Sequence, residues 1–305
     1  MGLLDDVRAN AEAVAKTATY VRVRTEVIEA YAAALPIHLA QSAELDSATH
    51  YLREPEETLK FVVTLDAINF GSGYFPRLTK RAGLSGYFTV AASLKERYES
   101  DGPLQAKQLE ALSAEDCARI FGQAANEDSG VAELMELFSR ALNDLGAYVG
   151  DRFGGSFRAL VERAEGSAER LVEILVEMPF YQDVGFYKRA QLTAADLGTA
   201  HVAQFHDLDR LTIFADNLVP HVLRVDGVLS YAPELLARID HEELIEKGSD
   251  EEREIRACAV HAVELIKQAS PQKPTSMQLD YVLWNRGQAP AYKAHPRHRT
   301  RTVFY

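Results

Sequence analysis

Asp216 places a carboxylate inside a largely apolar run over residues 211–231. A carboxylate held against apolar neighbours such as Phe214 can stabilise a positive charge that forms only during a reaction. The alternative is structural, because an Asp at the start of a helix commonly accepts a hydrogen bond from a backbone N–H. We expect this helix to begin near Asp216 or Asn217, since Pro220 is tolerated only in a first turn.

Other polar side chains that could contribute to a site lie far from this run along the chain. Asp66 and Asn69 fall one helical turn apart in an apolar segment, so they can share a face, or each can satisfy buried backbone groups. Lys188 precedes a predicted helix and could meet a phosphate there, although a Lys-Arg pair more often lies on a solvated surface. Asp280 interrupts another apolar segment, and His50 falls in a predicted loop. Chain order does not show whether these groups converge.

The elements that would position these side chains are predicted to be mostly helices, because apolar residues recur at three- and four-residue spacing. The clearest segments are residues 3–23, 27–35, 89–98, 131–149, 157–176 and 250–269, with another helix starting at Pro55. Aromatic residues mixed with Gly83 and Gly86 predict a small β hairpin within residues 74–87. The fold class is therefore mainly α, as a single domain over residues 1–305 or as two packed helical lobes.

The composition is that of a soluble globular protein of 305 residues, 47% of them hydrophobic. A formal net charge of -12 argues against nucleic acid as a partner and leaves room for a small ligand with one phosphate. Cys117 and Cys258 are far apart, which is typical of small core residues in a reducing cytoplasm. With no signal peptide and no apolar segment of membrane-spanning length, we expect a cytoplasmic protein without a membrane partner.

Common catalytic motifs do not occur in the sequence. It has no HExxH, no GxSxG and no His or Cys spacing of a metal site, so we expect neither a metal nor a cofactor. Gly154-Gly155 lacks the preceding strand of a nucleotide-binding loop and fits a helix C-cap followed by an N-cap. Single carboxylates remain as the candidates for chemistry.

Seven separated phrases, in order from His50 to Tyr305, resemble the queuosine-salvage proteins. They are Thr64-Leu-Asp-Ala-Ile-Asn-Phe70, Phe153-Gly-Gly-Ser-Phe157, Phe186-Tyr-Lys-Arg-Ala-Gln191, Leu211-Thr-Ile-Phe-Ala-Asp216, Glu254-Ile-Arg256, Leu279-Asp-Tyr-Val-Leu-Trp284 and His298-Arg-Thr-Arg301. Residues 1–40 match only in helical character. The resemblance implies a queuosine 5′-phosphate N-glycosylase that releases queuine, with a fold similar to helix-rich DNA glycosylases.

The same resemblance implies roles for individual residues. Asp216 matches the catalytic aspartate of the family, and Lys188 falls where the family has a lysine suited to the 5′-phosphate. Four residues fall on pocket phrases: Asn69, Phe70, Phe214 and Asp280. Asn217 departs from the aromatic residue that some relatives carry after the aspartate, which bears on pocket shape.

The remaining substrate contacts are expected from chemistry. Trp284, with Phe70, Phe214 and Tyr281, offers stacking surfaces for a planar base, although such aromatics are more often core residues. His50 and Asp280 could bind the cyclopentenediol of queuosine or its amine.

Two alternatives remain at this point. One is a base-excision glycosylase acting on DNA, for which the sequence Val225-Asp-Gly-Val-Leu229 is a weak echo of a DNA-binding hairpin. The other is a helical protein that binds queuine without catalysis. The acidic charge counts against the first alternative, and release of free base would exclude the second.

Overall fold

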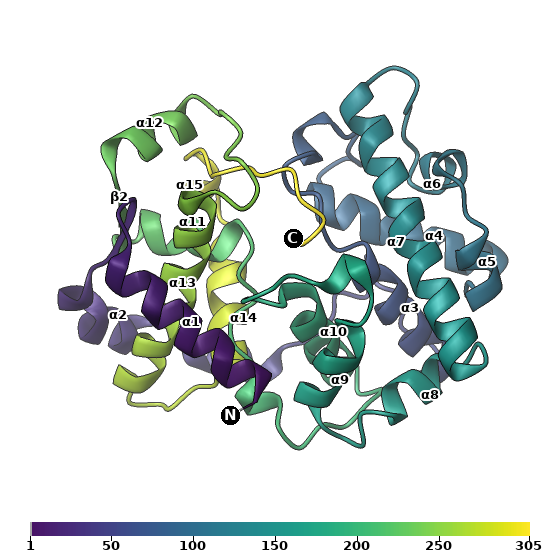
Figure 1. The fold of residues 1–305 in the computed structure, drawn as a ribbon, viewed down its shortest axis with the longest axis horizontal. Coiled ribbons are helices and arrows are strands. Elements are labelled where there is room, and N and C mark those ends of the chain that lie inside the picture. Colours follow the sequence, from purple (N-terminus) through teal and green to yellow (C-terminus); the bar gives the residue numbers. More distant parts are fainter. Residues whose placement is uncertain (1) are drawn as a thin grey trace.

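The computed structural model describes residues 2–305, and the chain is mainly helical (Figure 1). The helices are α1 (Leu3–Thr17), α2 (Ile28–Ala34), α3 (Pro55–Ala67), α4 (Gly86–Asp101), α5 (Ala106–Glu110), α6 (Ala114–Ile120), α7 (Ser129–Phe153), α8 (Phe157–Glu162), α9 (Ala168–Leu175), α10 (Lys188–Thr199), α11 (Leu218–Val225), α12 (Pro233–Asp240), α13 (Asp250–Ala269), α14 (Ser276–Arg286) and α15 (Pro290–Lys293). The strands are β1 (Val21–Val23) and β2 (Leu229–Tyr231). Among residues 2–305, no helix is both long and apolar enough to span a bilayer.

The buried side chains form two hydrophobic clusters. The first lies among α3 to α10, in the right half and lower middle of Figure 1, with α7 as its longest element. One face of α7 is buried, and its residues recur at helical spacing: Leu134, Phe138, Leu142 and Leu145. At Gly146, α7 and α5 approach so closely that an added Cβ would lie 2.4 Å from the backbone nitrogen of Glu110.

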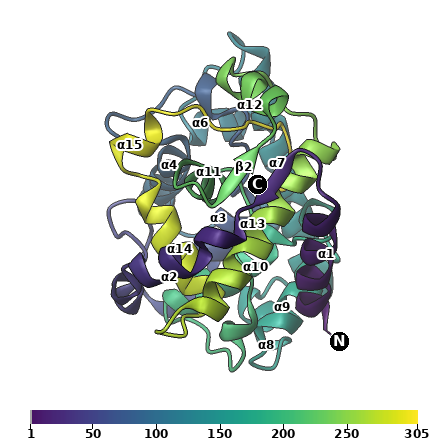
Figure 2. The same cartoon turned by 90° about the vertical axis from the view of Figure 1, so that its left-hand side faces the viewer.

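The second cluster is built around α13, with α1, α2, α11 and α14 packed against it. These helices form the left half of Figure 1 and face the viewer in Figure 2. As predicted, α13 turns Ile255, Ala259, Val263 and Ile266 to the interior. Ser249 caps this helix by accepting a hydrogen bond from the Glu252 backbone N–H at 3.2 Å.

The amino-terminal segment is bonded to both α13 and the run that carries Asp216. Glu254 on α13 accepts hydrogen bonds from three consecutive backbone N–H groups, those of residues 19–21, at 2.6–3.0 Å. Arg8 on α1 lies 3.2 Å from a Glu264 carboxylate oxygen and donates to the Leu211 carbonyl at 3.2 Å. The segment therefore helps to position the chain that leads to Asp216.

The β structure lies elsewhere than predicted. Residues 74–87 form a 3₁₀ turn at Phe75–Arg77, a loop and the start of α4, so the predicted hairpin is wrong. The Phe75 side chain packs directly on Gly86, where a Cβ would lie only 2.5 Å from Phe75 Cγ. Ser85 caps α4 by accepting a hydrogen bond from the Phe88 backbone N–H at 3.3 Å. The glycine and aromatic signals therefore belong to a helix start and to packing. The observed sheet pairs β1 with β2, antiparallel, with Val21 opposite Tyr231.

Two predicted helices also differ from the structure. The helix expected over residues 3–23 ends at Thr17. The helix expected over residues 157–176 is divided into α8 and α9, because Glu165 and Gly166 both adopt positive φ angles, which an α-helix cannot accommodate. By contrast, Gly154 forms the left-handed C-cap of α7 and Ser156 caps α8, as predicted.

Candidate functional site

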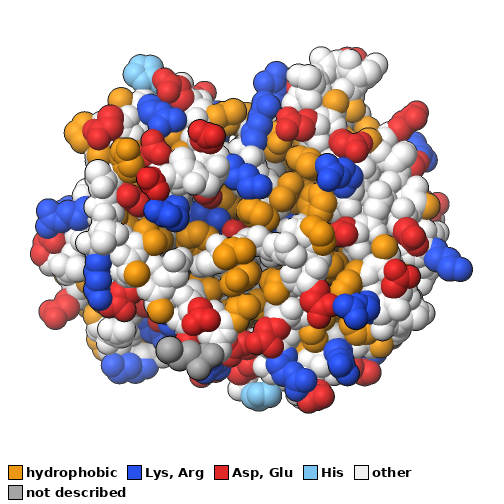
Figure 3. Space-filling view, in the orientation of Figure 1, with side chains coloured by type: hydrophobic (Ala, Val, Ile, Leu, Met, Phe, Trp, Pro, Cys, Tyr) orange, Lys and Arg blue, Asp and Glu red, His pale blue; other side chains and the backbone are white. Residues whose placement is uncertain are grey.

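A cavity of about 960 Å³ lies where the two hydrophobic clusters meet. Its wall is formed by the residues that follow α3, by α4 and α10 on one side, and by α11, α14 and the segment after α15 on the other. In the space-filling view, hydrophobic side chains gather in the hollow between the two halves (Figure 3). A cavity of this size accommodates a small organic ligand.

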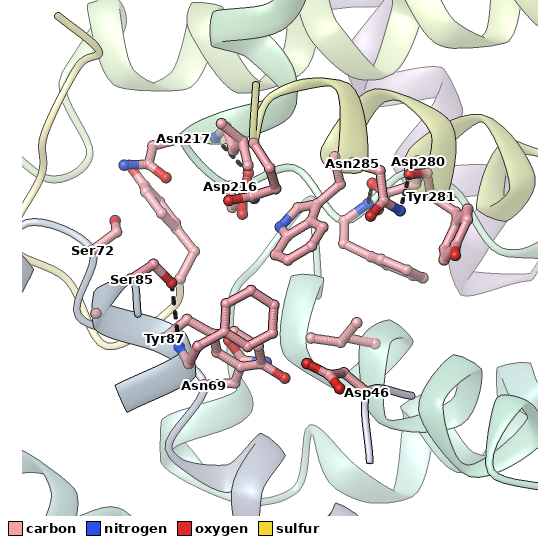
Figure 4. A pocket seen from close by; sticks show the side chains of 18 of the residues that line it. Asp46, Asn69, Ser72, Ser85, Tyr87, Asp216, Asn217, Asp280, Tyr281 and Asn285 are labelled. Atoms are coloured by element: carbon pink, nitrogen blue, oxygen red, sulfur yellow. Dashed lines mark hydrogen bonds between the residues drawn. The ribbon is translucent and has the colours of Figure 1, made fainter. Parts of the chain in front are cut away.

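Of the residues that the sequence suggests for a site, Asp66 does not line this cavity, Tyr281 does, and so do nine others. They are His50, Asn69, Phe70, Lys188, Phe214, Asp216, Asn217, Asp280 and Trp284. Asp216 and Asn69 approach the cavity from opposite sides (Figure 4). The structure thus brings these side chains together, while their individual roles stay predictions.

The two carboxylate oxygens of Asp216 have different surroundings. Its Oδ1 accepts hydrogen bonds from the backbone N–H groups of Leu218, at 2.7 Å, and Val219, at 3.3 Å, at the start of α11. Its Oδ2 has no hydrogen-bond partner among residues 2–305, and the half-buried side chain lines the cavity. The capping and functional interpretations of this residue are therefore compatible, because one oxygen orients the carboxylate and leaves the other exposed to a ligand.

Asp280 is a second carboxyl on the cavity wall, and it is buried. Its Oδ1 accepts a hydrogen bond from the Phe214 backbone N–H at 2.9 Å. Burial, with a further contribution from the negative charge of Asp216, raises the pKa of the Asp280 carboxyl to about 8. At neutral pH this carboxyl is mostly protonated, so it can donate a hydrogen bond to a ligand in the cavity.

Replacement of Asp280 by Asn should flatten the pH dependence of stability. The folded-state pKa of about 8 exceeds the ordinary value of 3.8, so the folded state binds more protons between these values and stability falls as pH rises through them. Asn does not titrate, and its side-chain oxygen can still accept from Phe214. Thermal unfolding from about pH 5 to about pH 8 should show a smaller decrease in Tm for Asp280→Asn than for wild type. Parallel curves would contradict the raised pKa.

Lys188 is buried at the first position of α10. Its Nζ donates to the Asn69 carbonyl at 3.3 Å and to the Asn69 Oδ1 at 3.4 Å. Burial lowers the pKa of the Lys188 ammonium, and the charges of Asp216 and Asp66 oppose that shift. Asp66 is itself buried with no hydrogen-bond partner for its carboxylate oxygens among the described residues, and burial raises its pKa to about 7.

An ion pair that sequence reasoning did not identify connects two of the candidate residues. Arg256 on α13 donates to both carboxylate oxygens of Asp183, at 2.9 and 2.6 Å, and all of these groups are buried. Arg256 Nε also donates to the Ala215 carbonyl at 2.9 Å, next to Asp216. Asp183 in turn accepts from the Lys188 backbone N–H at 3.1 Å. An Arg within a buried helix face was the available sequence signal.

Aromatic side chains form one wall of the cavity. Trp284 contacts Tyr87 and Phe88 edge-on, with ring centroids 6.4 and 5.7 Å apart. The buried His50 ring bonds through Nε2 to the Tyr87 hydroxyl at 3.0 Å, and burial lowers its pKa. Phe70 lies deeper, packed edge-on against Phe138 at 5.2 Å. Tyr87 was missed because the segment around it was assigned to a hairpin.

Fold and cavity together describe a helical protein with a carboxylate-containing cavity for a small ligand. Residues 49–305 match the family model described as queuosine salvage protein, so the chain belongs to the queuosine salvage family. It is 35% identical to the queuosine 5′-phosphate N-glycosylase/hydrolase of Sphaerobacter thermophilus, over 92% of this chain and 90% of that protein. It is also 31% identical to the protein of that name from Mus musculus (98% of both chains) and 33% identical to that from Bos taurus (72% of both).

Proposed function

We propose that this protein hydrolyses the N-glycosidic bond of queuosine 5′-phosphate and releases queuine for salvage into tRNA modification. The observation that carries the proposal is the oriented carboxylate of Asp216, which lines the cavity and has one oxygen free of protein hydrogen bonds among residues 2–305. Membership of the queuosine salvage family and the names of the relatives support the substrate. The reaction needs water and no cofactor.

The chemistry of glycoside cleavage requires such a group. As the bond from the sugar C1′ to the base nitrogen breaks, its electron pair leaves with the base and positive charge develops on the ribose. A fixed carboxylate beneath the ribose stabilises that charge, and an incoming water completes the hydrolysis at C1′. In this proposal Asp216 is the catalytic residue.

The departing base presents a further requirement. A 7-deazaguanine has carbon where guanine has N7, so the enzyme cannot assist departure by protonating that position. Hydrogen-bond donors to the base must carry more of the barrier, and the protonated Asp280 carboxyl is a suitable donor. Trp284 and Phe214 then offer apolar surfaces for the base plane, and His50 a contact for the cyclopentenediol or amine.

Several finer features belong to this proposal. They are an architecture like that of helix-rich DNA glycosylases, a cytoplasmic location, and the absence of nucleic-acid and membrane partners. The net charge of -12 supports a small substrate over DNA. A gel-shift measurement at low salt tests this point, because electrostatic DNA binding is strongest there.

The decisive experiment is incubation of the purified full chain with queuosine 5′-phosphate, followed by chromatography for free queuine. We expect stoichiometric release of queuine and ribose 5-phosphate over many turnovers. Tight binding of queuine without release would instead favour the non-catalytic carrier. Neither binding nor release would contradict the assignment altogether.

A further inference from the structure

In the segment after α15, successive side chains point alternately to the protein interior and to the cavity, and arginines occupy the cavity positions. The Pro296 carbonyl accepts from Arg224 Nη2 at 2.8 Å, and the Arg299 carbonyl accepts from the Ile245 N–H at 2.8 Å. Between these anchors His298 is buried, whereas Arg297 and Arg299 on the other side line the cavity. The backbone therefore places both Arg297 and Arg299 along the cavity wall.

Of these two arginines, only one has its charge compensated by a neighbouring side chain. Arg299 pairs with Glu242 at 3.0 Å. Arg297 is half-buried and has no hydrogen bond or ion pair within residues 2–305. Burial lowers the pKa of Arg297, while the charge of Asp216 opposes the shift, which places the two side chains within electrostatic reach of each other. A guanidinium in this position lacks an anion.

Lys188 is in the opposite situation. Its ammonium already bonds to Asn69 and shares its charge with the carboxyl groups of Asp216 and Asp66. A phosphate dianion placed there would add negative charge among groups that already compete for one buried cation. The predicted role of Lys188 as the phosphate contact therefore has a competitor at Arg297.

We propose that Arg297 binds the 5′-phosphate of the substrate and thereby sets the preference for the nucleotide over the free nucleoside. This inference rests on the proposed function. A guanidinium can hold a phosphate through two parallel N–H···O bonds, which fixes both its position and its orientation. With the phosphate at Arg297 and the anomeric carbon at Asp216, the ribose spans the space between the two side chains. Lys188 then serves to hold Asn69 and to balance the carboxylates beside the reacting bond.

The test compares kcat/KM for queuosine 5′-phosphate and for queuosine in wild type, Arg297→Gln, Arg297→Lys and Lys188→Ala. Arg297→Gln should lower kcat/KM for the nucleotide by about 10- to 100-fold and change that for the nucleoside little, because one charge-assisted contact is lost. Arg297→Lys should recover part of the loss, since it keeps the charge without the paired donors. Lys188→Ala should lower kcat/KM to a similar extent for both substrates. Arg238→Gln is the matched control, because Arg238 pairs with Glu251 at 2.9 Å and does not line the cavity.

Two results would overturn the inference. One is an equal loss for both substrates in Arg297→Gln, and the other is a selective loss for the nucleotide in Lys188→Ala alone. Calorimetric titration with ribose 5-phosphate separates this inference from the proposed function, because it needs no turnover. Binding that is lost in Arg297→Gln supports the inference even if no queuine is released, whereas binding unchanged in that variant contradicts it while leaving the glycosidase intact.

Discussion

Asp216→Asn should lower the rate of queuine release by about 10³-fold or more, because a neutral amide cannot stabilise the positive charge that develops on the ribose. The fold should survive. The Asn side-chain oxygen can accept the same two N–H groups, those of Leu218 and Val219, and Asn is as good an N-terminal cap as Asp. Single-turnover kinetics with queuosine 5′-phosphate measures the loss, and thermal unfolding checks the fold.

A matched control for this variant exists on α7. Asp128 also accepts two backbone N–H groups through Oδ1, from Gly130 at 2.7 Å and Val131 at 3.1 Å, but it does not line the cavity. Asp128→Asn therefore repeats the chemical change at a capping position away from the site and should keep the wild-type rate. Wild-type activity in Asp216→Asn would exclude Asp216 as the catalytic residue.

Arg256→Gln should give the largest loss of stability among the changes considered, about 3–5 kcal/mol of unfolding free energy. The substitution leaves the buried Asp183 carboxylate without its cation and removes the donor to the Ala215 carbonyl. Urea unfolding monitored by circular dichroism measures the effect. The double variant Arg256→Met with Asp183→Asn removes both charges of the closest pair and should recover part of the stability, because a buried ion pair as a whole contributes little net free energy. The recovery is incomplete because the buried Glu252 carboxylate, 3.4 Å from Arg256, also loses its partner.

Activity of that double variant separates packing from positioning. Asp183 and Arg256 together bond to the residue before Asp216 and to the backbone of Lys188. If the ion pair positions Asp216 and Lys188, the folded double variant should show a reduced kcat with a smaller change in KM. Arg253→Gln is the control, since this exposed arginine on the same helix pairs with Asp250 at 2.8 Å on the surface. Equal stabilities for Arg256→Gln and Arg253→Gln would contradict the expected role of the buried pair.

The helices with a long apolar period were predictable from the sequence, and α13 has the predicted bounds. The β1–β2 pairing was not predictable, because two three-residue strands about 200 positions apart leave no local pattern. The aromatic residues between Tyr74 and Tyr87 gave a false hairpin signal, since side chains that pack against helices and line a cavity have the same composition as a strand pair.

For the site, the chemically unusual residues were predictable and their electrostatic relations were not. Nine side chains chosen from the sequence line one cavity, and seven of them lie within the matching phrases. The protonation of Asp280 depends on burial and on its distance from Asp216, which only the folded chain determines. The partner of Arg256 could not be predicted, because helical spacing alone does not show that an interior carboxylate, Asp183, faces it.

The family match begins at residue 49, after α1, β1 and α2. A shortened gene product with that boundary would keep all nine candidate residues yet lose the amides that face Glu254 and the arginine that holds the Leu211 carbonyl. It would also lose Ala40, Glu44 and Asp46 from the cavity wall. Trimming a recombinant version to the family boundaries would therefore remove part of the cavity wall and the contacts that hold the run before Asp216.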